Sequence, residues 1–251
     1  MNTFFFIFLA FCLLPLASSA APAAVEAFNR GNDFYREGRY AEAVALYERA
    51  KAMGATDPDL YYNLGNAYFK DGRLGYAILN YERALRLSPR DEDVRQNLRF
   101  ANLRKTDKET EESGVISQVI AWVDGLMSLN GWYILCTVFY FLAVSSVIGL
   151  LVLTGDLRRF CRRLLVTTLT LMIVGGGVFL LKLRATVWTT TAIVVAAETD
   201  AMSGPGEDYT KTFTLHEGTK VRVQRRSEEW ALVRLASGLG GWVRRGTVET
   251  I

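Results

Sequence analysis

The sequence predicts a multidomain chain of α and β structure: an α-helical repeat solenoid, a two-helix transmembrane hairpin and a small C-terminal β-barrel. Three observations predict this fold class. Residues 24–105 are polar and repeat themselves, residues 131–182 hold two long apolar runs, and residues 190–251 alternate apolar and polar side chains. Because each pattern keeps to its own stretch, the overall apolar content of 50% describes no single domain.

Residues 1–20 have the pattern of a signal peptide. An apolar stretch from Phe4 to Leu16 precedes small residues, and Ser18 and Ala20 fit the positions that a signal peptidase recognises. We expect cleavage after Ala20. The segment before Phe4 contains no Lys or Arg, so an uncleaved anchor is the alternative. Either form would export the residues that follow.

Residues 24–57 and 58–91 are two copies of a helical hairpin at a 34-residue period. The matched positions include Phe28 with Tyr62, Asn32 with Asn66, Gly38 with Gly72, Ala43 with Ala77, and Tyr47 with Tyr81. Gly31 and Gly65 are expected to face Ala43 and Ala77, so that the two helices of each copy pack closely. A fifth helix, from about Asp91 to Lys105, is expected to cap the solenoid.

The second copy resembles the tetratricopeptide repeat family. The residues that carry the resemblance are Tyr61, Leu64, Gly65, Tyr68, Ala77, Tyr81, Ala84 and Pro89. The first copy departs from the pattern, because Ala27 and Arg30 stand where the family has an aromatic residue and a leucine. Edge repeats are commonly atypical, so the assignment stands.

That resemblance implies a groove lined by the inner helix of each repeat. The candidate partner-binding residues are Phe28, Asn32, Tyr35, Arg36, Tyr62, Asn66, Phe69 and Lys70. Asparagine, arginine and lysine can hold a partner's backbone or carboxylate, and the aromatic residues its apolar side chains. The alternative is that the aromatic rings only pack between helices and that the charges are solvated. The set does not reproduce the full carboxylate clamp of some co-chaperone repeats.

Residues 106–130 are expected to be a linker and a juxtamembrane amphipathic helix. The stretch from Val115 to Met127 places apolar residues along a broad helical stripe. It is interpreted either as a helix lying in the membrane interface or as an N-terminal extension of the first span. The polar side of the stripe has no Lys or Arg, which leaves both interpretations open.

Two uncharged runs predict transmembrane helices over residues 131–154 and 164–182. Residues 155–163 lie between them and are expected to form a short cytoplasmic loop by the positive-inside rule. The residues that set this topology are Arg158, Arg159, Arg162 and Arg163. The domains on either side of the hairpin would then share the opposite side of the membrane. Within the uncharged runs, which end at Gly155 and Leu181, there is no carboxylate, Lys, Arg or His, which argues against a pore.

Residues 190–251 read as five or six short strands separated by turn residues. They resemble a bacterial SH3 domain, and the residues that carry the resemblance are Ser203-Gly204-Pro205, Tyr209, Leu215 to Val221, Trp230, Val233 and Gly240 to Val243. The stretch Asp200-Ala201-Met202 departs from the family pattern. Tyr209, Trp230 and Trp242 are the candidate ligand-binding surface, and core packing is the alternative role for the two tryptophans.

The order of the whole chain resembles the BatE-type aerotolerance-operon membrane proteins. The stretches that carry this resemblance are Tyr62 to Tyr68, Ala77 to Leu85, and Asn97-Leu98. The resemblance implies an envelope membrane protein that works with von Willebrand factor A-type membrane proteins and a MoxR-type ATPase.

Composition and motifs argue against several other classes. The net charge of +3 is small, and the basic residues lie among acids or beside the membrane, which does not suggest nucleic-acid binding. The three cysteines, Cys12, Cys136 and Cys161, form no CxxC pair, and His216 is the only histidine. The sequence also has no GxxxxGK[ST] loop. We therefore expect no enzyme, no cofactor and no metal site.

These inferences lead to a hypothesis for function. The chain is expected to be a non-enzymatic scaffold in the bacterial inner membrane that presents the repeats and the SH3-like module to the periplasm. The repeats would bind a protein partner, and the SH3-like module a peptide or cell-wall ligand. The alternative is a peptidoglycan-binding sensor or regulator of cell-wall enzymes.

Overall fold

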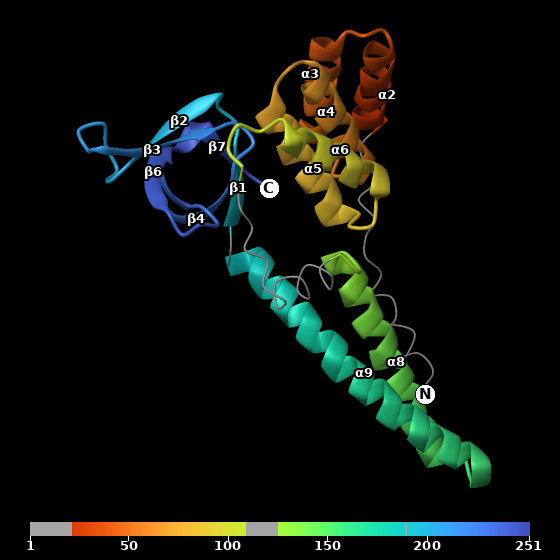
Figure 1. Ribbon diagram of the computed structural model, residues 1–251. Helices are drawn as coiled ribbons and strands as arrows, with labels where there is room; N and C mark the ends of the chain where they lie inside the picture. Colours follow the sequence, from red (N-terminus) through yellow and green to blue (C-terminus); the bar gives the residue numbers. More distant parts are fainter. Residues whose placement is uncertain (1–21, 109–124, 189) are drawn as a thin grey trace.

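The computed structural model describes residues 22–108, 125–188 and 190–251 and has three parts (Figure 1). Paired helices form the first part, two long apolar helices form a hairpin, and a seven-stranded antiparallel sheet curls into a barrel. This confirms the predicted fold class. The expected signal peptide, residues 1–20, and most of the stripe from Val115 to Met127 lie outside the described residues.

The repeats consist of two helical hairpins and a fifth helix. Their helices are α2 (Pro22–Arg36), α3 (Tyr40–Ala52), α4 (Pro58–Lys70), α5 (Leu74–Leu87) and α6 (Glu92–Leu103). Asp57 starts α4, because its side chain accepts the Asp59 N–H at 2.8 Å and Pro58 occupies the first helical position. Gly38 and Gly72, at φ 77° and 83°, follow α2 and α4 in the left-handed conformation that ends a helix.

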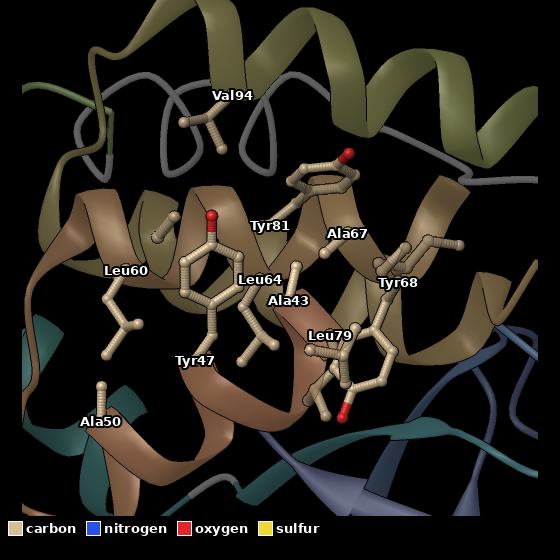
Figure 2. Packing of buried hydrophobic residues seen from close by; sticks show 14 of the residues in the cluster. Ala43, Tyr47, Ala50, Leu60, Leu64, Ala67, Tyr68, Leu79, Tyr81 and Val94 are labelled. Carbon is tan, nitrogen blue, oxygen red and sulfur yellow. The ribbon is translucent and has the colours of Figure 1, made fainter. Parts of the chain in front are cut away.

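Each hairpin closes by placing a tyrosine ring on a glycine. A Cβ on Gly31 would lie 2.6 Å from the Tyr47 ring, and one on Gly65 would lie 2.7 Å from the Tyr81 ring. Tyr47 and Tyr81 are 1% and 2% exposed and lie among small and aliphatic side chains, including Leu64 (Figure 2). The glycines therefore face mainly tyrosines rather than the alanines that the sequence suggested, although the Gly65 position is also close to the Ala77 carbonyl.

The hairpin consists of α8 (Leu129–Val152) and α9 (Gly155–Trp188). The prediction of a loop at residues 155–163 is wrong, because α9 begins at Gly155 and the Arg-rich stretch forms its first turns. Gly155 takes a φ of 62°, which reverses the chain in place of a longer loop. Asp156 then favours a helix start, since a carboxylate is stabilised near a helix N-terminus and arginine is a good helix former.

Two contacts join the helices of the hairpin near its two ends. At the turn, a Cβ on Gly149 would lie only 2.5 Å from the Sγ atom of Cys161. The thiol therefore fits between the helices because Gly149 has no side chain. At the open end, Lys182 Nζ donates to the Met127 carbonyl at 2.8 Å. The outer faces stay uncovered, with Leu151 82% and Ile173 76% exposed.

The barrel has the strand order β3-β2-β6-β5-β4-β1-β7. The strands are β1 (Thr190–Val194), β2 (Glu198–Met202), β3 (Lys211–His216), β4 (Lys220–Arg226), β5 (Trp230–Arg234), β6 (Gly240–Arg244) and β7 (Val248–Thr250), with the short helix η1 (Arg245–Thr247) before β7. The sequence did not predict β2 or β7. Glu, Asp and Ala have low strand propensity, and β2 is held by burial of Thr199 and Ala201 on its inner face.

The barrel packs against the second repeat, which the sequence did not predict. Ile193 of β1 is fully buried and belongs to the hydrophobic core of the repeats rather than to that of the barrel. A Cβ on Gly75 of α5 would lie 2.6 Å from the Val194 carbonyl oxygen, so the backbones of α5 and β1 approach directly. A Cβ on Gly218 would lie 2.6 Å from Ile78 Cδ1 of α5. The two domains therefore share one packed interface.

Polar contacts surround this interface. The Gly75 N–H donates to Glu217 Oε2 at 2.9 Å, and Lys220 Nζ donates to both carboxylate oxygens of Glu82 at 2.9 Å. Arg83 donates to the Thr250 carbonyl at 2.6 Å. Together with the apolar contacts of β1, these bonds fix the barrel on α5. The strands β5 and β6 are not neighbours of β1 in the sheet order.

Candidate protein-binding groove

Each repeat has a cluster of hydrogen bonds between an asparagine of its inner helix, a tyrosine of its outer helix and an asparagine of the next inner helix. We call the two clusters the amide ladder: Tyr47, Asn32 and Asn63, and then Tyr81, Asn66 and Asn97. In the first repeat, the Tyr47 hydroxyl donates to Asn32 Oδ1 at 2.7 Å, and Asn63 Nδ2 donates to the same oxygen at 3.0 Å. The second repeat has the same arrangement 34 positions later, with distances of 2.7 and 2.9 Å to Asn66 Oδ1. The ladder therefore joins α2 to α4, and α4 to α6.

The ladder fixes the orientation of two side-chain amides. Because the oxygens of Asn32 and Asn66 each accept two bonds, their Nδ2 groups point the other way and have no partner among the described residues. Each Nδ2 group can donate to a carbonyl or carboxylate oxygen of a ligand. The ladder thus presents two oriented donors, one per repeat.

Burial keeps the tyrosines of the ladder protonated. Desolvation raises the pKa of Tyr47 and of Tyr81 far above the ordinary phenol value. Both hydroxyls consequently remain donors over the whole working pH range. The tyrosine hydroxyls therefore always donate to the Oδ1 atoms of Asn32 and Asn66, and the Nδ2 groups of these two asparagines keep their orientation.

Two adjoining hollows form the groove. The first, of about 210 Å³, is lined by Asn32, Tyr35, Arg36, Tyr47, Asn63 and Asn66. The second, of about 290 Å³, is lined by Tyr35, Tyr62, Asn66, Phe69, Lys70, Tyr81, Asn97 and Phe100. Since Tyr35 and Asn66 border both, the hollows form one surface across α2, α4 and α6.

Charges and rings are arranged along that surface. Lys70 lines the second hollow, and the guanidinium of Arg104 lies 5.2 Å from the Phe69 ring centroid and 4.9 Å from that of Phe100. Arg36 lines the first hollow and pairs at 3.1 Å with the exposed Asp33, an interaction that water screens. The groove combines amide donors, positive charge and aromatic walls, which suits an extended, acidic or carboxylate-bearing peptide.

The structure brings seven of the eight candidate groove residues to these two hollows. Phe28 lies elsewhere: it contacts Tyr47 at 5.7 Å between ring centroids and lines a separate hollow with Ala55 and Leu60. Sequence reasoning missed Asn63, Asn97 and Arg104 as groove residues. The first two carry a signal in the sequence, because they occupy equivalent positions one 34-residue period apart.

The SH3-like candidates lie on the outer surface of the barrel. Trp242 and Trp230 are half-buried and alternate with the buried residues Val243 and Ala231, so they lie outside the core. Trp242 pairs with Met202 at the base of the β2–β3 connection. That connection carries the 51% exposed Tyr209, whose ring occupies the space where Gly204 has no side chain.

His216 is a structural residue. Its backbone N–H and its ring Nδ1 each lie 2.8 Å from a carboxylate oxygen of Asp107, in the segment after α6. The Thr219 hydroxyl donates to Asp107 Oδ2 at 2.7 Å. Partial burial alone would raise the pKa of Asp107, but these hydrogen bonds outweigh it and leave the pKa below its ordinary value. No group of three or more metal-ligating residues occurs among the residues that the structure describes.

Helix pairs stacked at a fixed period, beside a small curled antiparallel sheet, define a protein built from two interaction modules. Comparison with protein families makes both specific. Residues 31–72 match the family described as TPR repeat, residues 58–91 the tetratricopeptide repeat, and residues 203–249 the bacterial SH3 domain. The chain contains tetratricopeptide repeats and a bacterial SH3 domain, which are typically non-catalytic modules. No curated protein matches the chain.

Proposed function

We propose that this protein is a non-enzymatic adaptor whose repeat groove binds an extended segment of a partner protein. The observation that carries the proposal is the amide ladder, which holds one free Nδ2 donor per repeat, that of Asn32 in the first hollow and that of Asn66 where the two hollows meet. Donors at a regular spacing match the carbonyl groups of an extended peptide, and Lys70 adds a positive charge for an acidic or C-terminal carboxylate.

The hairpin anchors the adaptor in a membrane. Two helices, Leu129–Val152 and Gly155–Leu183, each contain an apolar stretch of 18 residues, with mean hydropathies of 2.4 and 2.3, and only 11% of each stretch is buried inside the protein. Apolar side chains exposed along both helices would be unfavourable in water and favourable in lipid. With the Arg-rich start of α9 in the cytoplasm, the repeats and the barrel lie in the periplasm at the inner membrane.

The partner belongs to an envelope stress or aerotolerance-type complex. The resemblance to BatE-type proteins supports this choice, and it suggests a von Willebrand factor A-type membrane protein as the partner. A groove for an extended peptide fits a tail or loop of such a protein better than it fits a small molecule.

Photo-crosslinking in the intact chain tests the groove. A photoreactive phenylalanine analogue in place of Phe69 should give a discrete protein adduct in cells, whereas the same analogue in place of Phe28, outside both hollows, should not. Adding Lys70→Met, which leaves the amide ladder intact, should reduce the Phe69 adduct severalfold. Equal adducts at both positions, or an adduct at Phe69 that is insensitive to Lys70→Met, would remove the groove assignment.

A second candidate function rests on the barrel. Bacterial SH3 domains suggest cell-wall or peptide binding, and the exposed Tyr209 with the half-buried Trp230 and Trp242 offers aromatic surface for such a ligand. In this alternative the protein is a peptidoglycan-binding sensor or a regulator of cell-wall enzymes. Co-sedimentation of the full chain with purified peptidoglycan separates the two functions. Retention that is lost in Tyr209→Ala and unchanged in Lys70→Met would favour the second.

A further inference from the structure

Five exposed arginines lie on β4, β5 and η1 of the barrel, and we call them the basic rim: Arg222, Arg225, Arg226, Arg234 and Arg245. None forms an ion pair with any residue within the described ranges. Two of them, Arg222 and Arg234, are direct cross-strand neighbours in β4 and β5. Like charges placed opposite one another destabilise a sheet, so this arrangement calls for an anionic ligand rather than for a role in folding.

Strand register places the basic rim next to the end of α9. A single residue, 189, separates α9 from β1, and Thr191 of β1 pairs with Arg222. Because β1 and β4 are antiparallel and Thr190 pairs with Val223, the rest of β4 runs past the start of β1, on the side where the chain leaves α9. Arg225 and Arg226 lie on that overhang. In Figure 1, β1 is the strand nearest to the end of α9, and β4 lies beside it along the lower edge of the barrel.

The same end of the barrel carries Arg245, whereas Arg234, which pairs with Gly240, lies at the far end of β5. Arg226 pairs with Ala231 and Arg225 with Leu232, which brings the start of β5 to this end. The Arg245 N–H donates to the Glu229 carbonyl at 2.8 Å, so η1 lies there as well. Glu228 and Glu229 of the β4–β5 turn are the nearby acids, and three of the arginines, at 225, 226 and 245, surround them. Half-buried Trp230 and Leu232 lie among these charges.

Lengths place this end of the barrel at the depth of lipid headgroups. The apolar part of α9 ends at Leu183, and five further residues lead to Trp188, a rise of about 7 Å. Thr191 is three residues beyond, at most about 10 Å along an extended chain. The headgroup layer occupies about 5–8 Å outside the hydrocarbon core, and arginine side chains extend over several ångströms towards it.

We infer that the basic rim binds the anionic phospholipid headgroups of the membrane that holds α8 and α9. Guanidinium groups form paired hydrogen bonds with phosphate, and arginine clusters beside a membrane span are drawn to anionic lipid. Trp230 and Leu232 add the aromatic and aliphatic surface that lies well at the boundary between headgroups and acyl chains. The repeats contact β1 and the start of β4, at Lys220, so the docking leaves the other end of β4 and the β4–β5 turn free. The inference rests on the membrane anchoring proposed above.

The test is lipid photo-crosslinking of the full chain in nanodiscs. Nanodiscs contain a phospholipid with a photoreactive headgroup, either phosphatidylglycerol or phosphatidylcholine, and adducts are mapped by mass spectrometry. The phosphatidylglycerol probe should label peptides of β4, the β4–β5 turn and η1, with about a fivefold preference over phosphatidylcholine for each arginine that contributes. High salt should reduce that preference, because exposed charges are screened.

Matched variants isolate the basic rim. The triple variant Arg225→Gln, Arg226→Gln and Arg245→Gln should reduce labelling of these peptides by phosphatidylglycerol to the phosphatidylcholine level. The control carries the same loss of charge on the repeats, at Arg30→Gln, Arg49→Gln and Arg90→Gln, all exposed and without an ion pair in the described part of the chain, and it should label like the parent.

The outcomes separate this inference from the anchoring itself. Labelling of α8 and α9 by both probes shows that the hairpin is in the bilayer, whatever happens at the barrel. Labelled helices with equal, low labelling of the barrel by both probes overturn the lipid assignment. The lipid assignment is equally overturned if the triple variant keeps its lipid labelling. It is also overturned if the barrel shows no lipid labelling while polyglutamate or purified peptidoglycan binds the parent, and not the triple variant, in phosphatidylcholine nanodiscs.

Discussion

Replacing Gly75 with alanine should separate the barrel from the repeats while improving the helix that carries the change. The new Cβ would lie 2.6 Å from the Val194 carbonyl oxygen and 3.0 Å from Val195 Cα. The first is a backbone atom of β1, which is held between β4 and β7, and the second belongs to the next residue, whose N–H donates to the Thr247 carbonyl, so neither can move aside. Ala41, at the equivalent position of the first repeat, shows that alanine is accommodated at this position where no domain docks.

The expected size follows from the overpacking alone. Alanine also favours the helix over glycine, but α5 is helical whether or not the barrel is docked, so this gain cancels in the docking equilibrium. Overpacking of a close contact costs about 1–3 kcal/mol, and a cost of about 1–2 kcal/mol raises the undocked population about 5- to 30-fold.

Hydrogen exchange at the amide of residue 75 measures this population. That N–H lies in the first turn of α5, where it has no helical acceptor, and its partner is Glu217 of the barrel at 2.9 Å. After correction for the intrinsic rates of glycine and alanine, exchange in Gly75→Ala should be about 5- to 30-fold faster. Ala41→Gly, which reverses the change in the undocked repeat, should leave residue 75 unaffected. An unchanged rate in Gly75→Ala would refute the docking geometry.

Two further predictions concern the same interface. Gly218 and Gly238 have φ values of 85° and 91°, so alanine at either should destabilise the barrel by about 1–2 kcal/mol in thermal unfolding, but only Gly218→Ala, which meets Ile78, should also speed exchange at residue 75. The pKa of Asp107 is lowered in the folded protein, so its contribution is present above the ordinary carboxyl pKa of about 4 and is lost as the pH falls below it. Exchange at residue 75 should therefore rise, beyond its intrinsic pH dependence, more steeply below about pH 4 in the parent than in Asp107→Asn, which keeps the Glu82 and Glu217 carboxylates of the interface. The same acid dependence in both would contradict this assignment.

The helical part of the fold could be predicted because its signals are local and periodic. Residues such as Gly65 and Tyr81 recur at a 34-residue spacing, and the packing of the tyrosine on the glycine explains that recurrence. The apolar runs of the hairpin are equally direct. The turn between them was misjudged, because arginines that suggest a cytoplasmic loop by charge are also good helix formers, and a single glycine, Gly155, suffices to reverse the chain.

The docking of the barrel could not be read from the sequence. Gly75 looks like an ordinary glycine near a helix start, and Ile193 like an ordinary strand residue, until the two surfaces meet. The groove is an intermediate case. Asn32 and Asn66 were identified from the family pattern, whereas the part played by Asn97 depends on α6 stacking as a further inner helix.

The docking of the barrel and the short junction between α9 and β1 bring the chain back to the repeats. Along the chain, the repeats lead through residues 104–128 to α8, around the turn into α9, and through one residue into β1. In space, β1 returns to α5 of the repeats through Ile193. The repeats are therefore joined to the hairpin twice, to α8 along the chain and to α9 through the contact of β1 with α5, so undocking of the barrel would leave only the first connection.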